Sequence, residues 1–510
     1  MKPEDIDLRK PLAALLAFAL LFAMPAAFME EAAVSLMGYE EADNNRVWAN
    51  HRFFERMEEA TGVRFDFAQY SDLNNYLNTL KAFTVEDGNL PQVLFKAQLD
   101  PVTAQELLDK GVLVDLAPYL KDSAPNFYAL MESDQAIARA ISLEGGAIPA
   151  LPHLAGRPGQ NILWINKTWL DELKLQAPTN LEEFEQVLSA FKTRDPNRNG
   201  RNDEIPLSVL GPYEMKYLAH AWGLLANDFN IFLEDGKVSF MPLEEGFERF
   251  VADTARWYEE GLLDRDSFTT LDSLRRVKDA KAANRFGAFF APLPTVVVPM
   301  EWTGQYQALM PFQYEGRAVY RAAASPVFYG AFALTTACED IPRMLSWVDR
   351  LYTREGAILA GVGVEGADYV VDGDGSWRLL REPGDRSYLS EVIIAADQST
   401  PGISMDDFQL SYTDPVVRSL TEQTMQVAAA SALPFPDLPL TQADINAIAP
   451  LQAQLGRYVD ESIARFVMGE WQPTAEQFAA FRTQLEELGV QDFLALWQGI
   501  LDREDGNHGL

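Results

Sequence analysis

The stretch between residues 195 and 206 has the residue types and the spacing of a site for a hard cation. Side-chain oxygens recur along it, Gly200 permits a sharp turn, and one main-chain carbonyl can add a further oxygen. Calcium takes about six to eight oxygen ligands, which one short segment of this kind can supply. The sequence therefore predicts a calcium site with these ligands: Asp195, Asn197, Asn199, Arg201 through its carbonyl, Asp203 and Glu204.

This segment does not follow the EF-hand pattern. If Asp195 is the first position, the twelfth position is Pro206, where an EF-hand requires a bidentate glutamate, and the nearest acid is Glu204. The alternative is an ordinary turn rich in Asn and Asp, because these residues are common between elements. We favour calcium, since a turn needs only one or two such residues.

Motifs for other chemistry are absent from the sequence. It contains no metalloprotease H-E-x-x-H, no G-x-S-x-G and no P-loop, and it has only four histidines. A literal G-x-G-x-x-G at 361–366 follows a helical pattern and precedes a strand, which is the wrong order for a dinucleotide site. Catalysis by a carboxylate pair stays open, because the 75 acidic residues allow many pairs.

Composition narrows the class of protein. The 510 residues suffice for two to four domains, and a hydrophobic content of 48% predicts a substantial core. The formal net charge of -33 disfavours binding to nucleic acid, because phosphates would be repelled. A single cysteine cannot form a disulfide within the chain.

Residues 1–30 resemble an export signal. An apolar run at 12–24 follows Lys2, Arg9 and Lys10, as in a secretory signal peptide. The longer apolar stretch is close to the roughly 20 residues that span a bilayer, so an uncleaved N-terminal anchor is the alternative. We expect an exported protein, periplasmic or extracellular. No cysteine lies directly after the apolar run, so a lipid anchor at an N-terminal cysteine is not expected.

The elements that must position a site alternate between helix and strand. Helical and strand periodicities occur at 48–60, 63–67, 73–83 and 92–95. This alternation predicts a parallel sheet. Ligands of open parallel sheets bind beyond the carboxyl ends of the strands, which directs attention to the loops at 38–45, 69–72 and 96–100.

The calcium segment has a clear place among the later elements. Thr179 and Glu182 form a predicted capping box at the start of a helix, and the segment follows the end of that helix and leads into a strand at 205–210. An ion there would connect a helix to a strand, which suits a structural role. The C-terminal part, 441–502, is predicted to be mainly helical.

Several motifs occur in a fixed order that resembles one protein family. They include LWINKTWL at 163–170, the helix after Pro178, the 195–206 segment, DGKV at 235–238 and YEEGLLD at 258–264. Together they resemble the extracellular solute-binding proteins of ABC importers. The resemblance is to the large carbohydrate (oligosaccharide)-binding family 1 type, which includes alginate-oligosaccharide and lipoprotein-type sugar binders.

The resemblance implies an α/β, two-lobed periplasmic-binding-protein fold, with hinge strands between the lobes and a helical C-terminal region. Lobe one is expected at 34–150 and 292–328, and lobe two at 160–290 and 330–510. Hinge closure on a ligand is the motion of such proteins. The family's metal ligands correspond to the six positions given above.

The function implied is that of a binding protein and not of an enzyme. It would capture a carbohydrate, most simply an oligosaccharide, and deliver it as a monomer to the transmembrane permease subunits of an ABC transporter. The alternatives are a polysaccharide-cleaving enzyme and a membrane-tethered sugar sensor. Aromatic rings suit sugar faces, and an arginine suits an acidic ligand. The candidate ligand contacts are Trp302, Tyr306, Trp48, Trp222, His153 and Arg157.

Overall fold

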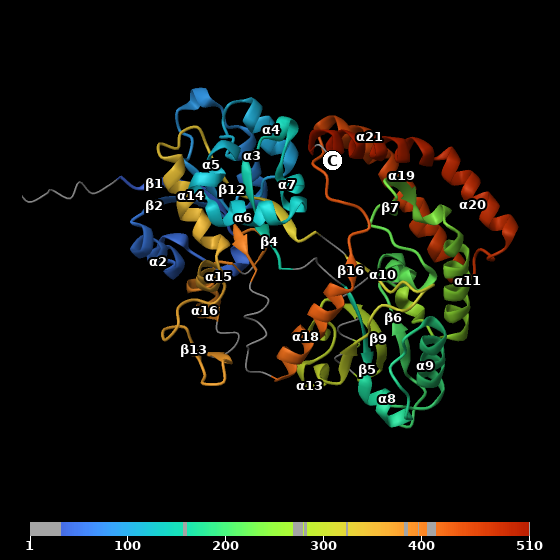
Figure 1. Cartoon of the computed structure of the whole chain (residues 1–510). Coiled ribbons are helices and arrows are strands. Elements are labelled where there is room, and N and C mark those ends of the chain that lie inside the picture. The colour runs from blue at the N-terminus through green and yellow to red at the C-terminus, as the bar shows by residue number, and fades with distance from the viewer. Residues whose placement is uncertain are drawn as a thin grey trace, which may run out of the picture.

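The chain folds around two separate β-sheets, which define two lobes (Figure 1). The computed structural model describes residues 32–156, 161–268, 279, 283–322, 325–381, 386–395, 397–404 and 415–508. Among these residues, no helix is long and apolar enough to cross a membrane. The predicted export signal at 1–30 lies outside the described residues.

Lobe one contains a six-stranded sheet in the order β15-β4-β12-β3-β1-β2. Strand β1 is parallel to β2 and β3, whereas β12 runs antiparallel to both β3 and β4. The predicted parallel sheet is therefore present, with one reversed strand inserted. The strands are β1 (Val34–Tyr39), β2 (Phe65–Tyr70), β3 (Val93–Phe95), β4 (Ala150–Leu154), β12 (Val327–Leu334) and β15 (Gly402–Ile403).

Helices cover both faces of this sheet (Figure 1). Side chains alternate along β3, so Phe95 enters one hydrophobic cluster with Trp347 while Leu94 enters the opposite cluster with Tyr76. A hairpin of β13 (Tyr369–Val371) and β14 (Trp377–Leu379) follows the helix at residues 354–361. The helices are α2 (Arg52–Thr61), α3 (Leu73–Lys81), α4 (Pro101–Asp109), α5 (Ala117–Ser123), α6 (Pro125–Ser133), α7 (Gln135–Ile141), α14 (Ile341–Asp349), α15 (Arg354–Gly361) and α16 (Arg386–Glu391).

Lobe two contains a four-stranded sheet in the order β10-β5-β9-β6. Strand β9 pairs antiparallel with β5 and parallel with β6. Two short ribbons accompany it, β7 with β8 and β11 with β16. The strands are β5 (Ile162–Asn166), β6 (Ile205–Ser208), β7 (Ile231–Glu234), β8 (Lys237–Phe240), β9 (Phe286–Ala291), β10 (Tyr306–Ala308), β11 (Tyr320–Arg321) and β16 (Ser431–Ala432).

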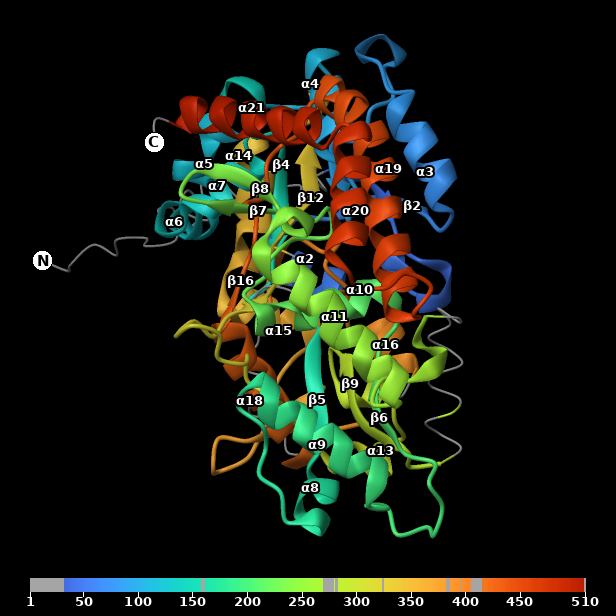
Figure 2. The same ribbon diagram turned by 90° about the vertical axis from the view of Figure 1, so that its right-hand side faces the viewer.

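The expected helical C-terminal region is confirmed and belongs to lobe two. Its side chains share one hydrophobic cluster with the lobe-two sheet, and α19 packs on α11, α10 and α21 (Figure 2). The lobe-two helices are α8 (Lys167–Leu173), α9 (Leu181–Thr193), α10 (Gly211–Leu218), α11 (Glu245–Glu260), α13 (Met300–Thr303), α18 (Pro415–Ala429), α19 (Gln442–Val467), α20 (Ala475–Glu487) and α21 (Val490–His508).

The structure corrects the expected lobe boundaries in two segments. Most of 292–328 lies in lobe two, because β10 pairs with β5 and β11 pairs with β16. Conversely, the part of 330–510 that ends at β15 lies in lobe one, because β12 is inserted between β3 and β4. The chain passes between the sheets after β4, after β11 and after β15.

The start of α9 shows a smaller correction. Asn180, and not Thr179, is the N-cap, since its side-chain oxygen accepts a hydrogen bond from the Glu183 main-chain nitrogen at 2.9 Å. The carboxylate of Glu183 in turn accepts from the main-chain nitrogen and the hydroxyl of Thr179. The N-cap therefore lies one residue later than predicted, and the glutamate accepts from the residue before the N-cap and not from the N-cap itself.

His220 is buried in lobe two as a neutral imidazole, and this predicts a pH dependence of stability. Its Nδ1 donates to the Tyr217 carbonyl and its Nε2 accepts from the Phe312 main-chain nitrogen, both at 3.0 Å. Burial lowers the pKa of His220 to about 4. In the unfolded chain the pKa of His220 is near 6.5, so between about pH 6.5 and pH 4 the unfolded chain binds a proton that the folded chain does not bind. The free energy of unfolding therefore falls as the pH drops from about 6.5 to about 4.

The expected loss is on the order of 3 kcal/mol of unfolding free energy across that pH window. Urea unfolding of the natural protein and of His220→Gln at several pH values measures this loss, because the other titrating groups contribute equally to both proteins. The free energies of unfolding of the two proteins should converge as the pH falls toward 4. A constant difference would show that His220 does not titrate as its burial requires.

Candidate functional site

A cavity of about 380 Å³ lies in lobe one beyond the carboxyl ends of β1 and β3. This volume falls within the range of small-molecule sites. Two of the loops selected from the sequence, 38–45 and 96–100, contribute to its wall. The lining residues are Tyr39, Glu41, Lys96, Gln98, Phe328, Tyr329, Gly330, Ala331, Asp397, Gln398 and Ser399.

The backbone after β3 is held in an unusual conformation that shapes this cavity. Lys96 and Gln98 have φ values of 50° and 51°, a left-handed region that non-glycine residues seldom adopt. Between and after them, Ala97 and Leu99 donate main-chain hydrogen bonds to the carbonyls of β12, where its register is irregular. Gly330 also has a positive φ, and a Cβ there would lie 2.1 Å from the Leu99 carbonyl oxygen. Such strain concentrates at functional sites.

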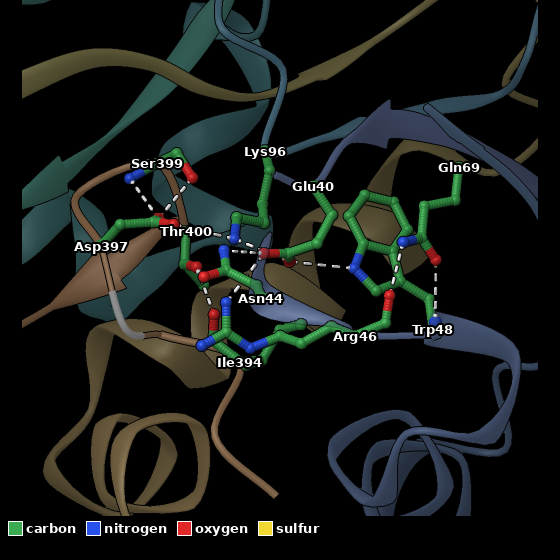
Figure 3. Close-up of polar contacts among 10 residues, drawn as sticks. All are labelled: Glu40, Asn44, Arg46, Trp48, Gln69, Lys96, Ile394, Asp397, Ser399 and Thr400. Atoms are coloured by element: carbon green, nitrogen blue, oxygen red, sulfur yellow. Dashed lines mark hydrogen bonds and ion pairs between the residues drawn. The ribbon is translucent and has the colours of Figure 1, made fainter. Parts of the chain in front are cut away.

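A buried carboxylate gathers polar side chains from the two loops that contribute to the cavity wall (Figure 3). Glu40, 1% exposed, accepts hydrogen bonds from Asn44 and Arg46 on one oxygen and from Trp48 and Lys96 on the other, at 2.7 to 3.2 Å. Burial by itself would raise the pKa of Glu40, but the charges of Lys96 and Arg46 hold it below its usual range. The cluster thus fixes the loop after β1 against the loop after β3.

Lys96 connects this cluster to a third segment of the chain, which lies before β15. Its ammonium group is 2.8 Å from Glu40 and 3.1 Å from Asp397, which is 301 residues away in sequence (Figure 3). Asp397 also accepts from the main-chain nitrogen and hydroxyl of Ser399. Burial would raise the pKa of Asp397, but Lys96 and Ser399 hold it lower, and 40% of the side chain stays exposed. An ionised carboxylate therefore faces the cavity.

The surroundings of Tyr39 show the sign of the local potential. Burial raises the pKa of the Tyr39 phenol, and the nearby charges of Glu41, Asp72, Glu40 and Asp397 raise it further. Negative charge near a phenol opposes its ionisation. The mouth of the cavity is consequently an electronegative environment that offers hydroxyl, amide and carboxylate groups.

Three of the aromatic residues predicted to contact a ligand are instead part of the hydrophobic cores. Trp48 is 0% exposed, and Trp222 and Tyr306 are each 1% exposed. Their polar atoms are satisfied inside the protein: Trp222 donates to Asp253, and Tyr306 donates to the Phe286 carbonyl. None of the three rings offers a face to a ligand. The structure therefore corrects these predictions, because neighbouring elements cover rings that lie beside polar sequence.

The other predicted contacts have different outcomes. Trp302 is half-buried on α13, so ligand contact there stays a prediction. His153 is 6% exposed and its ring nitrogens contact the Thr400 carbonyl and the Ser404 hydroxyl, so it fastens β15 to β4 and does not face the cavity. Arg157 lies outside the described residues.

The predicted calcium segment joins α9 to β6, as the sequence indicated. Local hydrogen bonds order this turn: the carboxylate of Asp195 accepts from the main-chain nitrogens of Asn199 and Gly200, at 3.1 and 3.0 Å. The Asn197 and Asn199 side chains accept from main-chain nitrogens two residues later. Gly200 has a φ of 73°, which completes the turn.

Glu204 gives the strongest sign that this segment fits a cation. The residue is 3% exposed, yet neither carboxylate oxygen has a hydrogen-bond partner within the described part of the chain. Burial raises the pKa of Glu204, and the charges of Asp195 and Asp203 raise it further. A buried carboxylate without a partner is costly unless a cation balances it. Among the described residues, no three His, Cys, Asp or Glu side chains lie close enough together to hold a metal, so a site in this segment would also require amide and main-chain oxygens.

Sequence reasoning missed the residues that organise the cavity. It selected the loops that carry Glu40 and Lys96, but not these side chains, because nothing in the sequence distinguishes a buried acid from the many solvated ones. Asp397 had no signal at all, since its loop follows a helix far from β1 and β3. The parallel-strand pattern alone led toward the site.

The chain is similar in sequence and in fold to known solute-binding proteins. The chain is 23% identical, over 483 residues covering 89% of it and 87% of the relative, to the fructooligosaccharide ABC transporter substrate-binding protein FusA of Streptococcus pneumoniae. A solved HMO-binding, ABC-transporter-associated solute-binding protein of Bifidobacterium longum infantis has a TM-score of 0.73 at 20% identity, with 92% of this chain and 98% of that chain covered. The predicted two-lobed fold and the resemblance are confirmed. No family model matches the chain.

Two further solved structures bear on the ion. One is an EF-hand mutant of S. pneumoniae FusA in complex with fructo-nystose, with a TM-score of 0.66 at 19% identity, covering 93% of this chain and 100% of that chain. The other is the alginate-binding protein AlgQ2 without calcium ion, with a TM-score of 0.61 at 20% identity, covering 92% and 98%. An EF-hand and a calcium ion are thus named for these two proteins.

Proposed function

We propose that this chain is the substrate-binding component of an ABC importer, which captures an oligosaccharide between two hinged lobes and delivers it to the transmembrane subunits of a permease. The observation that carries the proposal is the cavity at the carboxyl ends of β1 and β3, in a chain similar over nearly its whole length to such proteins. Ligands of open α/β sheets bind at this edge. Carboxylate, amide and phenol groups around the cavity suit the hydroxyl groups of a sugar.

Binding is favoured over catalysis by the state of Asp397. A glycosidase needs one carboxyl with a raised pKa as general acid beside a second, ionised carboxylate. Lys96 and Ser399 hold the pKa of Asp397 below its usual range, so this side chain is an acceptor for ligand hydroxyls and a poor acid. The relatives described above are likewise named as binding proteins.

The three passages between the sheets provide the hinge in this proposal. A lobe joined to its neighbour by such connections can rotate toward it when a ligand binds between the two lobes. We expect an exported monomer that meets its permease in the closed form. Trp302 on α13 of lobe two is retained as a candidate sugar contact.

The proposal includes a structural calcium ion in lobe two. Its ligands would be Asp195, Asn197, Asn199, Asp203, Glu204 and the carbonyl of Arg201. The ion would supply the positive charge that the unpartnered carboxylate of Glu204 requires. It would hold α9 to β6 and would take no part in sugar contact.

Isothermal titration calorimetry against a panel of oligosaccharides tests the proposed function. We expect saturable binding of at least one carbohydrate, weakened roughly tenfold or more by Asp397→Asn, because hydrogen bonds to charged groups contribute about 1.5 to 3 kcal/mol. Asp374→Asn is the matched control. Asp374 makes the same two hydrogen bonds, to the main-chain nitrogen and hydroxyl of Ser376, but it does not line the cavity.

Three results would contradict the proposal. The first is the absence of binding by every carbohydrate, the second is tight binding of a peptide alone, and the third is release of sugar products during incubation. If Asp397→Asn and Asp374→Asn weaken carbohydrate affinity equally, the protein would still be a carbohydrate-binding protein, but the lobe-one cavity would not be its binding site.

A further inference from the structure

The charges around the lobe-one cavity bear on which kind of sugar the cavity can accept. Lys96 is the only cationic side chain among the described residues that line it. Its side chain is 1% exposed, and its ammonium group contacts both Glu40 and Asp397. Arg46, the other cation of the cluster, is 5% exposed and forms an ion pair with Glu40. Neither cation is presented to a ligand.

Negative charge is what the cavity does present. Glu41 is exposed at the wall, and Asp397 keeps 40% of its side chain accessible. Within the Glu40 cluster two cations balance two carboxylates. Glu41 adds a charge that none of the described cations of this cluster balances, and Asp72 adds another close to Tyr39. Like charges brought together without a counter-charge cost several kcal/mol at a binding site.

The same wall is well suited to hydroxyl groups. The exposed part of Asp397 can accept from ligand hydroxyls, and the amides of Gln98 and Gln398 can both donate and accept. Hydrogen bonds to an ionised acceptor are about twice as strong as neutral ones. A neutral sugar unit therefore gains strong hydrogen bonds where a uronate would meet repulsion.

We propose that the lobe-one cavity is a subsite for a neutral sugar unit and that it discriminates against uronates through Asp397 and Glu41. This inference rests on the proposed function and specifies the class of carbohydrate. It separates this chain from uronate binders that share its fold, and it makes Asp397 and Glu41 residues that determine specificity.

The test compares neutral oligosaccharides with uronate oligosaccharides of the same length by calorimetry at moderate ionic strength. The natural protein should bind the best uronate roughly 30-fold or more weakly than the best neutral ligand. Glu41→Gln and Asp397→Asn should each narrow this ratio, because each removes one negative charge with little change of shape. Asp374→Asn should leave the ratio as it is. High salt should also narrow the ratio in the natural protein.

Each outcome has a distinct meaning. Binding of neutral sugars with a ratio that narrows in both variants supports the inference. Uronate binding equal to or tighter than neutral binding overturns the inference but leaves the proposed function intact. A large ratio that neither variant nor salt changes also overturns it, because the discrimination would then be steric. No binding of any carbohydrate overturns both proposals.

Discussion

Replacing Glu40 with leucine is expected to lower the unfolding free energy of lobe one by about 3 to 5 kcal/mol, the cost of removing one partner from a buried ion pair. The substitution takes a carboxylate away from two cations that are 1% and 5% exposed, Lys96 and Arg46. It also removes acceptors for Asn44 and Trp48. Calorimetric melting should show a large downward shift of the lobe-one transition.

Glu59→Leu is the matched control for this prediction. Glu59 forms an ion pair with Arg56 on α2, but the two side chains are 66% and 45% exposed. Surface pairs of this kind contribute little to stability, because water competes for both partners. Equal shifts for Glu40→Leu and Glu59→Leu would show that the buried cluster does not stabilise lobe one.

Calcium is expected to stabilise the natural protein by about 2.7 kcal/mol when its concentration is 100 times the dissociation constant, and a chelator should reverse the effect. Glu204→Gln should abolish this response. In chelator, the variant should be more stable than the natural protein, because an amide removes a buried charge that lies close to Asp195 and Asp203. The order of melting temperatures should therefore reverse between calcium and chelator.

This reversal separates an ion ligand from a residue that is only structural, whose loss would destabilise the protein in both conditions. Glu172→Gln serves as the control. Glu172 lies on α8 and forms an ion pair with Arg198 of the calcium segment, but it is not among the predicted ligands. That variant should keep the calcium response. A full response in Glu204→Gln would contradict the assigned ligand set.

The parts of the fold that were predictable from sequence are those in which neighbouring residues carry the information. The strand and helix alternation of the first hundred residues gave the parallel strands and the loops at their carboxyl ends. The helical pattern of 441–502 is confirmed by α19, α20 and α21. The N-cap of α9 was misplaced by one residue, because Thr179 and Asn180 can both accept from the helix start and only the backbone conformation selects one.

Burial of particular side chains was not predictable in the same way. Trp48, Trp222 and Tyr306 lie beside polar residues in sequence, yet all three are covered by elements from elsewhere in the chain. The lobe boundaries failed for a related reason. The position of β12 between β3 and β4 depends on pairing between strands that are more than 150 residues apart, and periodicity carries no information about such pairing.

The sequence by itself was enough to predict the calcium segment, because all of its proposed ligands lie within ten residues and the turn that carries them is local. It also predicted parallel strands that alternate with helices, since strand and helix periodicities are local as well, whereas the two-lobed fold was expected from the resemblance to solute-binding proteins. Only the tertiary structure brought the proposed sugar site together. Glu40, Lys96 and Asp397 meet because β1 and β3 end at one edge of the sheet and the segment before β15 reaches the same place. Long-range packing brings these three residues together. It also buries the carboxylate of Glu40 and leaves that of Asp397 partly exposed as a hydrogen-bond acceptor.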